Sequence, residues 1–424
     1  MLSVQFIREN TERVKRDLLL RNTTAPIDRI LHLDDQRRTL LTQVEELRAE
    51  RNAVSKEIGK SKDPGERDAK IAAMRAVGDR IDALDARLKT AESELNEKLL
   101  EVPNIIDPGV PPGPDEHSNV VIETVGTLPH FGFTPKPHWE LGETLEGIDF
   151  TRGVKMAGSR FFIFRGGVAR LHRALIQFML NEHIAAGFTE YYLPDMLSEA
   201  SLYASGQLPK FRDNLYRDAE EDYFFIPTAE VAFVNLYRDE IIPPGKLPMR
   251  LVAATPCFRR EKMSAGRDVR GIKRVHQFEK VEMFSYCEPE QSEAELQLIL
   301  SRARLIPELL GLTYRVVALC SGDIGFNSTK TYDIEIWSPG VGEWLEVSSV
   351  SNCLDFQARR ANIRYRPSAD AAVRHPHLLN GSGLAPGRVL IALMENYQLE
   401  DGSIAIPEVL QPYMGTDRLA LPGA

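Results

Sequence analysis

The sequence predicts an α+β protein in two parts: an N-terminal arm of two antiparallel helices, then a larger domain with an antiparallel sheet flanked by helices. Two observations predict the arm. Apolar residues recur every three or four positions through residues 30–58 and 77–95, which is the spacing of a coiled-coil seam. Gly and Pro residues at 59–65 end the first helix and turn the chain. The sheet is predicted because strand-like segments beyond residue 114 follow one another without crossover helices.

The composition fits a globular protein of two or three domains. Of the 424 residues 43% are hydrophobic and 27% are charged, and the formal net charge is -9. This acidic balance argues against a protein that coats nucleic acid, although it permits a local basic surface. The N-terminus lacks a signal-peptide pattern, and no stretch reaches the ~18 apolar residues of a membrane span. Four cysteines without a Cys-x-x-Cys pair indicate reduced thiols. We therefore expect a cytoplasmic protein without a membrane partner.

The arm is expected to be a hairpin within one chain. Each helix of about 30 residues would reach roughly 45 Å, and a short turn makes the two seams neighbours. The alternative is a coiled coil that joins two copies of the chain. Basic residues near the turn could contact nucleic-acid phosphates or form a solvated face, and alone they favour the second interpretation. They are Lys56, Lys60, Lys62, Arg67 and Lys70.

The larger domain is expected to follow a Pro-rich linker at 108–114. A long apolar helix pattern, RLHRALIQFMLNEHIAAG, precedes the strand-like FTEYYLP. Further strand-like segments are YFFIPTAEVAF, RLVAATPCF, VHQFEKVEMFSY, TYRVVAL, YDIEIW and EWLEVSSV. Together these segments predict a mixed domain of helices and sheet that is large enough to be catalytic.

Common nucleotide-binding motifs do not occur in the sequence. The tripeptide GKS at 59–61 resembles the end of a P-loop, but Val54 stands at the position of its first Gly, and the tripeptide falls in the predicted helix turn. NGSGLAPG lacks the dinucleotide-binding spacing. No Ser-His-Asp or zinc-protease signature is present. A nucleotide site in this chain must be of another kind.

A basic segment at 258–284, FRREKMSAGRDVRGIKRVHQFEKVEMF, carries eight Lys and Arg residues in this acidic chain. If its ends are the strands of one hairpin, alternation can place Arg259, Glu261, Phe278 and Glu282 together, with Arg260 on the other face. Arg suits phosphate, an aromatic ring suits a base, and a carboxylate accepts from an amine or a hydroxyl. A lattice of cross-strand ion pairs on a surface sheet is an equally good interpretation of the residues.

Five segments and the arm, which follow one another along the chain in the order expected of the family, resemble the seryl-tRNA synthetase family of class II aminoacyl-tRNA synthetases. AAGFTEYYLP resembles motif 1, CFRREKMSAGRDVRGIKRVHQFEKVEMF resembles motif 2, and GSGLAPGRVLIALMENYQLEDGSIAIPEVLQPYM resembles motif 3. IPTAEV and EWLEVSSVSNCLDFQARR match further segments of the family, and the helical hairpin is similar to its tRNA-binding arm. The resemblance therefore spans nearly the whole chain.

The resemblance implies a serine–tRNA ligase of bacterial type, with a tRNA-binding domain at 1–106 and a class II catalytic domain at 107–424. Such an enzyme uses ATP and Mg²⁺ to convert L-serine to seryl-adenylate, then transfers the seryl group to the 3′ end of serine tRNA. It forms a homodimer through motif 1. No protein nucleophile is required, because the serine carboxylate attacks the α-phosphorus and the protein supplies position and charge.

For the amino acid, the resemblance implies a site made of Thr228, Glu230, Arg259, Glu282 and Ser382. Thr228 and Glu230, on one face of an extended segment, would receive the amino group. Glu282 and Ser382 would bind the hydroxyl group. A site that hydrogen-bonds a hydroxyl can reject an analogue without it by about 10⁴ to 10⁵, whereas threonine must be excluded by shape.

For ATP, the implied residues are Arg259, Arg260, Glu261, Val275, Phe278, Glu346, Val347, Ser348, Ser349 and Arg388. Arg259 and Arg388 would be catalytic: the first would bridge the serine carboxylate and the α-phosphate, and the second would hold the γ-phosphate. Glu261 would accept from the adenine amino group and Phe278 would stack on the purine, with Val275 alongside. Helical spacing of the apolar residues after Arg388 places this residue near a helix N-terminus, where phosphates are favoured.

Glu346 and Ser349 would coordinate the Mg²⁺ that binds the nucleotide phosphates, since hard cations prefer oxygen ligands. Strict alternation along a strand places these two residues on opposite faces. Both can therefore serve one ion only if the strand ends or bulges between them.

The sequence departs from the family pattern at the start of the motif 2 loop. Relatives commonly have Ser at the position of Arg260 and Glu-Ala-Gly-Ser where this chain has EKMS, which includes Lys262 and Met263. Arg260 is predicted to face away from Arg259, so we expect serine activation to tolerate it. The sequence leaves open how the loop contacts ATP and the acceptor end of the tRNA.

Other functions share parts of this pattern. A paralogue could form seryl-adenylate for a carrier or a biosynthetic pathway, although such relatives tend to lack the arm. A non-catalytic tRNA-binding homologue would most readily arise by loss of Arg259, Arg388 or Glu346, and all three are present. A coiled-coil scaffold would leave the larger domain unexplained. The sequence does not show which tRNA features are read, or whether selenocysteine tRNA is also a substrate.

Overall fold

The computed structural model of the chain describes residues 1–60, 62–262 and 270–423. Two compact units make up the chain, Met1–Pro103 and Asn104–Ala424. In the described part of the chain, no helix combines the length and apolar character needed to cross a membrane.

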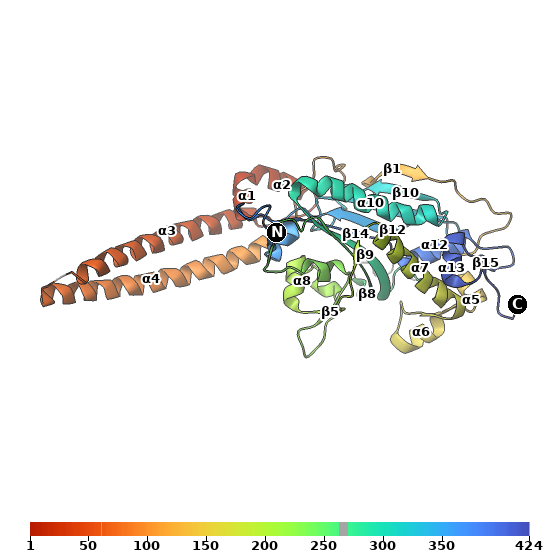
Figure 1. Ribbon diagram of the computed structural model, residues 1–424, viewed down its shortest axis with the longest axis horizontal. Helices are drawn as coiled ribbons and strands as arrows, with labels where there is room; N and C mark the ends of the chain where they lie inside the picture. Colours follow the sequence, from red (N-terminus) through yellow and green to blue (C-terminus); the bar gives the residue numbers. More distant parts are fainter. Residues whose placement is uncertain (61, 263–269, 424) are drawn as a thin grey trace. The chain divides into compact units, whose positions relative to one another are not determined.

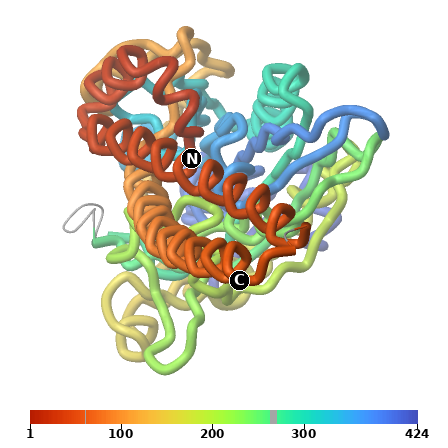
Figure 2. The backbone as a smooth tube through the Cα atoms, turned by 90° about the vertical axis from the view of Figure 1, so that its left-hand side faces the viewer, coloured from red at the N-terminus to blue at the C-terminus, as the bar shows by residue number. Residues whose placement is uncertain are grey.

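The first unit contains the long helical hairpin that the sequence predicts (Figure 1). Its helices are α1 (Val4–Glu9), α2 (Thr11–Leu20), α3 (Ile27–Ile58) and α4 (Pro64–Leu99). The helices α3 and α4 run antiparallel beside each other, as the two views of the backbone show (Figures 1 and 2). Ion pairs join them, at 2.6 Å between Arg29 and Glu94 and at 2.8 Å between Arg48 and Asp85. The pairing of the two seams within one chain is confirmed.

Burial along the hairpin decreases toward the turn. Ile30, Leu33, Leu40 and Val44 of α3 are buried, whereas Val54 and Ile58, the seam residues nearest the turn, are only half-buried. A single partner helix covers less of each side chain than a packed core does, which explains this decrease. Arg51, which the predicted seam included, is exposed.

At the turn, Asp63 caps α4 by accepting a hydrogen bond of 2.8 Å from the backbone N–H of Gly65. Ser61 of the GKS tripeptide lies outside the described residues. The side chain of Lys70 pairs with Glu57 and Glu66. The other basic residues named near the turn are exposed; they are Lys56, Lys60, Lys62 and Arg67.

The second unit is built on an eight-stranded sheet. In spatial order its strands are β1 (Val120–Val125), β10 (Tyr314–Ala318), β11 (Lys330–Ser338), β12 (Glu343–Asn352), β14 (His377–Ser382), β9 (Gln277–Cys287), β8 (Met249–Phe258) and β4 (Thr189–Glu190). Every neighbouring pair is antiparallel except the last, in which β4 runs parallel to β8. The predicted antiparallel sheet flanked by helices is confirmed.

The two faces of the sheet are covered differently, and β9 shows this most clearly. Its residues Val281, Met283 and Cys287 point into the main core, which packs against α7 (Gly166–Ala185), α10 (Ser292–Leu309) and α12 (Pro386–Asn396). Phe284 and Tyr286 point to the opposite face, where a second core lies beneath α9 (Glu230–Val234) and α11 (Phe356–Arg360). The strand positions before Phe284 on this second face line an open cavity instead of a core.

Short elements complete the second unit. Its remaining helices are α5 (His138–Thr144), α6 (Phe150–Ala157), α8 (Glu199–Ser205) and α13 (Gln411–Met414). Two-residue strands pair as β2 (Ile148–Asp149) with β3 (Ile163–Phe164), β5 (Met196–Leu197) with β6 (Phe224–Phe225), β7 (Ile241–Ile242) with β13 (Arg364–Tyr365), and β15 (Ile404–Ala405) with β16 (Arg418–Leu419).

The prediction of a Pro-rich linker at 108–114 is wrong. This stretch is held to the second unit, because the backbone N–H of Ser321 donates to the carbonyl of Pro111 and that of Gly322 donates to the carbonyl of Gly113. Val110 is buried in a small apolar cluster with residues of β10 and of the loop that follows it. Proline reduces the conformational entropy that a segment loses on folding, so a Pro-rich stretch can be held in place at a low cost. Its composition therefore does not distinguish a linker from a fixed segment.

Candidate active site

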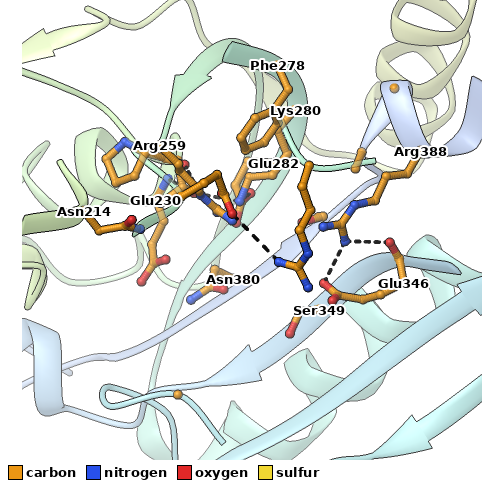
Figure 3. Close-up of a pocket in the computed structure, with 18 of the residues that line it drawn as sticks. Asn214, Glu230, Arg259, Phe278, Lys280, Glu282, Glu346, Ser349, Asn380 and Arg388 are labelled. Atoms are coloured by element: carbon orange, nitrogen blue, oxygen red, sulfur yellow. Dashed lines mark hydrogen bonds and ion pairs between the residues drawn. The ribbon is translucent and has the colours of Figure 1, made fainter. Parts of the chain in front are cut away.

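The uncovered part of the sheet's second face forms a cavity of about 600 Å³ (Figure 3). Strands β9, β12 and β14 form its floor, and loops at 207–215, 227–230, 272–275 and 325–328 contribute walls. The cavity brings together twelve of the residues named from the sequence: Thr228, Glu230, Arg259, Glu261, Val275, Phe278, Glu282, Glu346, Val347, Ser349, Ser382 and Arg388.

Two residues named from the sequence do not line the cavity. Arg260 is exposed, and its backbone N–H donates to the carbonyl of Asn214 at 3.0 Å. Ser348 is buried beneath the floor, where its hydroxyl donates to the carbonyl of Ser382 at 2.6 Å. Ser348 can therefore fix the backbone of Ser382 without reaching a ligand. Lys262 is exposed, and Met263 lies outside the described residues.

The hairpin of β8 and β9 presents its polar side chains to the cavity. Cys257 pairs with Phe278 in the strand register, and Arg259 follows directly after the end of β8. The Arg259 guanidinium lies 5.1 Å from the centre of the Phe278 ring, and its Nε donates to the carbonyl of Pro227 at 3.2 Å. Only 1% of Glu282 is exposed. These charges lie inside a cavity, so the alternative of an ion-pair lattice on a surface sheet does not hold.

The inner end of the cavity contains two carboxylates and a lysine. The ammonium of Lys280 pairs with the Glu282 carboxylate, and it donates to the Thr228 hydroxyl at 2.7 Å. The register of β14 and β9 places Ser382 opposite Glu282. Burial raises the pKa of Glu230, and the negative charge of Glu282 adds to the rise, while a hydrogen bond from Gln357 at 2.6 Å opposes it. Figure 3 shows Glu230, Lys280 and Glu282 on the side of the cavity away from Glu346 and Arg388.

The geometry that places Thr228 and Glu230 at this end differs from the prediction. The prediction was an extended segment with both residues on one face. In the structure Ala229 has helical dihedral angles, and Glu230 is the first residue of α9. The preceding Pro227 favours an extended conformation only for the residue before it, so the chain is free to enter a helix after Thr228.

At the outer end, a β-bulge brings Glu346 and Ser349 to the same side. Glu346 pairs with Glu335 and Ser349 pairs with Asp333, which lie two residues apart on β11, while Val347 has no partner in the register. The extra residue restores a common face for positions that strict alternation would separate. The carbonyl of Val347 accepts a hydrogen bond of 3.0 Å from Ala385, the residue before α12.

Arg388 lies in the first turn of α12, as the helical spacing predicted. Its Nη1 donates to the Glu346 carbonyl at 2.8 Å and lies 3.4 Å from the Glu346 carboxylate. Its Nε donates to the carbonyl of Lys273 at 3.4 Å. Figure 3 shows the guanidinium directed at Glu346, on the side of the cavity away from Glu230. The outer end therefore combines a helix N-terminus and a guanidinium, which are groups that bind phosphate.

The outer end also suits a divalent cation with few protein ligands. Burial raises the pKa of Asp333 well above its usual range, and the charge of neighbouring Glu346 adds to this effect. Within the described residues, Asp333 Oδ1 has no hydrogen-bond donor. The described part of the chain holds no group of three or more His, Cys, Asp or Glu residues arranged for a metal. Mg²⁺ typically binds one or two protein oxygens together with substrate phosphates and water, so Glu346 and Ser349 fit this ion.

A buried pair behind the outer end, His138 and Glu395, was not identified from the sequence. His138 Nε2 accepts from the backbone N–H of Ile272 at 3.1 Å, so its proton is on Nδ1, which donates to Glu395 at 3.0 Å. Glu395, on α12, also accepts from Ser338 at 2.5 Å and from the backbone N–H of Gly340 at 2.9 Å. This network ties α12 to the segment that returns into β9. The two partners are 257 positions apart, and no local pattern indicates them.

Other residues in the cavity or next to it were also missed. Lys280 stands on the strand face that the sequence analysis identified, but it received no role. Gln357 occurs within EWLEVSSVSNCLDFQARR, the segment from residue 343, and bonds to Glu230. Asn214, Phe326 and Asn380 line the cavity from loops and a strand without any motif of their own. Alternation was the one signal that could have indicated Lys280.

Comparisons with known proteins agree with this geometry. The family model of the seryl-tRNA synthetase N-terminal domain matches residues 1–106, and that of the tRNA synthetase class II core domain (G, H, P, S and T) matches residues 210–397. The chain is 58% identical to a serine–tRNA ligase of Roseiflexus castenholzii over 98% of each sequence.

Two solved structures are similar over the full chain. One is the seryl-tRNA synthetase from Pyrococcus horikoshii complexed with ATP, with a TM-score of 0.94 and 38% identity over 99% of this chain and 100% of that one. The other is the cytoplasmic serine–tRNA ligase from Naegleria fowleri in complex with AMP, with a TM-score of 0.90 and 28% identity over 100% and 99%. The chain belongs to the seryl-tRNA synthetase family of class II aminoacyl-tRNA synthetases.

Proposed function

We propose that this chain is an ATP-dependent serine–tRNA ligase. The observation that carries the proposal is the cavity itself, which has buried carboxylates at one end and a guanidinium with a helix N-terminus at the other, in a chain similar over its full length to serine–tRNA ligases. In the first step, a serine carboxylate oxygen bonds to the α-phosphorus of ATP while the bond to the β-phosphate oxygen breaks and pyrophosphate leaves. In the second, the ribose hydroxyl at the 3′ end of serine tRNA attacks the acyl carbon and AMP leaves.

Serine is proposed to bind at the inner end. Glu282, whose buried carboxylate faces Ser382 across the strands, would accept from the serine hydroxyl together with Ser382. Glu230 would receive the amino group, with Thr228 beside it, and Arg259 would bind the carboxylate. Because the Arg259 guanidinium lies between the inner end and Phe278, it can contact both the serine carboxylate and the α-phosphate. Holding both reactants in line is the main contribution that the reaction needs.

ATP is proposed to extend from the hairpin to the outer end. Adenine would stack on Phe278 beside Val275, and its amino group would donate to Glu261. The backbone of Glu261 has a left-handed φ of 51°, which turns its side chain back into the cavity instead of along a continuing strand. Arg388 would hold the γ-phosphate. The segment from Glu346 to Ser349 would line the phosphates, with Ser348 acting from beneath through Ser382.

Mg²⁺ is proposed to be held by Glu346 and Ser349, where it would neutralise the charge of the β- and γ-phosphates. The bulge at Val347 supports the proposal, because it places both oxygen ligands on the cavity side. The raised pKa of the buried Asp333 carboxyl favours its neutral form, so Glu346 would be the charged ligand at this position. Arg388, which pairs with Glu346, would orient the carboxylate toward the ion.

The two parts of the chain are proposed to divide the work. Residues 1–106 would form a domain whose helical arm binds serine tRNA, and residues 107–424 would form the catalytic domain. A homodimer is proposed through motif 1, which includes the edge strand β4; Tyr192, two residues beyond this strand, is fully exposed. The cytoplasm is the proposed location, where tRNA and ATP are present.

Serine-dependent exchange of labelled pyrophosphate into ATP tests the first step. We expect exchange with serine and none above background with alanine, in the presence of Mg²⁺. Charging of serine tRNA in parallel tests the second step. Exchange without charging would indicate a paralogue that loads another acceptor, and the absence of both would indicate a binding homologue.

A further inference from the structure

Lys280 occupies the centre of the inner end, where a cation is unusual. It stands on β9 two positions before Glu282 and on the same face, and only 11% of its side chain is exposed. A lysine this buried is rare unless its charge is paired. Its ammonium has two partners, the carboxylate of Glu282 and the hydroxyl of Thr228 at 2.7 Å. Both partners belong to the proposed serine site.

The hydrogen bonds of Thr228 limit what its hydroxyl can do. Its Oγ accepts from the Lys280 ammonium at 2.7 Å and from the backbone N–H of Glu230 at 3.3 Å. A hydroxyl has two acceptor positions and one hydrogen to donate. Because both acceptor positions are filled, Thr228 can only donate to a ligand. An ammonium group has donors alone, so the amino group of serine needs the Glu230 carboxylate, and Thr228 would donate to an oxygen of the substrate.

Lys280 also changes what Glu282 can do. Its ammonium forms an ion pair with Glu282 Oε2. A neighbouring cation favours the charged form of a carboxylate, and a charged carboxylate has about four acceptor positions, so one ion pair leaves positions that can accept from a ligand hydroxyl. Without a neighbouring cation, a buried carboxylate tends to take up a proton and then presents a donor instead.

The charges around this site come from several elements. Glu230 on α9 and Glu282 on β9 are the anions, and Lys280 and Arg259 are the cations that face them. Burial raises the pKa of the Cys257 thiol, on β8, to about 11, and also raises the pKa of the thiol of Cys353, which follows β12. Both thiols are therefore neutral at physiological pH. Serine binds as a zwitterion, which adds no net charge to the site. The two anions and the two cations of the protein must therefore balance one another before serine binds.

We propose that Lys280 is a positioning residue for serine recognition, which holds Glu282 as a hydrogen-bond acceptor and Thr228 as a donor. This inference rests on the proposed function, because it takes serine as the ligand of the inner end. Lys280 need not contact the substrate. It acts through the two side chains that do.

The test uses the full chain and measures KM for serine and for ATP separately in pyrophosphate exchange. Lys280→Met removes the charge and the donor while keeping a similar volume. We expect KM for serine to rise by about tenfold or more, which corresponds to one hydrogen bond to a charged group, while KM for ATP changes little. Lys280→Arg keeps the cation and should recover most of the loss. Lys330→Met is the matched control, since Lys330, on β11 of the same sheet, also pairs with a glutamate (Glu293 of α10) but lies outside the cavity.

The pH dependence separates positioning from a general loss of structure. Without Lys280, Glu230 and Glu282 would share a proton at neutral pH, because two neighbouring buried carboxylates cannot both ionise easily. Binding of the serine ammonium would have to displace this proton. In Lys280→Met, KM for serine should therefore fall as pH rises from 6 to 8, by at most about tenfold per unit. The unmodified chain and Lys280→Arg should lack this slope.

Equal changes in both KM values in Lys280→Met, or a pH slope identical to that of the unmodified chain, would overturn the inference. If Lys280→Met does not fold, Lys280→Gln decides, since its amide can still donate to Thr228 but carries no charge. That variant should show the pH slope with a smaller rise in KM, and a flat profile would refute the role of the charge. Absence of serine-dependent exchange in the unmodified chain would instead refute the proposed function.

Discussion

Glu346 and Ser349 face the same side of β12 because Val347 forms a bulge between them. Without the bulge, one of the two oxygens would point into the core beside Ile334 and Ile336, where no ion could bind. The same bulge directs the Val347 carbonyl to Ala385, so it also fixes the start of the helix that carries Arg388. One inserted residue thus positions both the proposed Mg²⁺ ligands and the helix that carries Arg388.

Glu346→Gln should raise the Mg²⁺ concentration needed for half-maximal exchange by about tenfold, because an amide oxygen binds a hard cation less tightly than a carboxylate does. KM for serine should stay the same, since the inner end is unchanged. Titration of Mg²⁺ at saturating serine checks this expectation. Glu293→Gln, at an exposed position of α10, is the control. An unchanged Mg²⁺ requirement would show that Glu346 does not hold the ion.

Glu282→Ala should reduce the preference for serine over alanine, by up to about 10⁴-fold if the carboxylate provides most of the hydroxyl recognition. The reason is that the unmodified site leaves a buried carboxylate without its partner when alanine binds. Exchange rates with each amino acid at equal concentration measure the preference, and ATP binding should persist. Unchanged discrimination would refute the role of Glu282.

Acid should destabilise the second unit through His183, which is buried on α7. Burial lowers its pKa from 6.5 to about 4. A histidine with a depressed folded pKa contributes stability above its unfolded pKa, and this contribution is lost as pH falls from 6.5 toward 4. The free energy of unfolding should drop by at most about 1.4 kcal/mol per pH unit in this window for one such group.

Urea unfolding at pH 7 and pH 5 measures this effect. His183→Gln can still donate to the Gly383 carbonyl but cannot titrate, so its loss of stability between the two pH values should be smaller. His32→Gln, at an exposed position of α3, should match the unmodified chain. Equal losses of stability between pH 7 and pH 5 in His183→Gln and in the unmodified chain would contradict a lowered pKa of His183.

Shortening the arm should weaken tRNA binding without affecting serine activation. The ion pair of Arg48 with Asp85 marks positions that face each other on α3 and α4. Residues 48–85 can therefore be replaced by a short Gly–Ser turn that joins 47 to 86 and preserves the lower part of the hairpin. We expect KM for tRNA in charging to rise by about tenfold or more, while exchange is unchanged. A normal KM for tRNA would show that residues 48–85 do not contribute to tRNA binding.

Much of the fold was predictable, because periodicity reports local structure directly. The seam at 30–58 and the alternation along 277–287 each depend on which side of one element is buried, and both were interpreted correctly. The alternation also identified the cavity face of the β8–β9 hairpin. Patterns of this kind fail where the backbone departs from a regular period, as it does at Val347 and at Thr228.

The parts that were missed depend on contacts between distant segments. His138 and Glu395 meet across 257 positions, and Gln357 reaches Glu230 across 127. The Pro-rich segment at 108–114 was taken for a linker because composition does not show what a segment packs against. Lys280 shows a different limit, since alternation along the strand gives the face of its side chain but not the residues that its ammonium contacts. A residue that acts through its neighbours becomes visible only when those neighbours are placed.

Charging of purified serine tRNA with labelled L-serine distinguishes a serine–tRNA ligase from the alternatives in a single measurement. We expect ATP- and Mg²⁺-dependent attachment of serine to the 3′ end of this tRNA, loss of attachment when Arg259 is replaced by Ala, and no attachment of alanine above background. Failure to charge serine tRNA under conditions in which a known serine–tRNA ligase charges it fully would contradict the account.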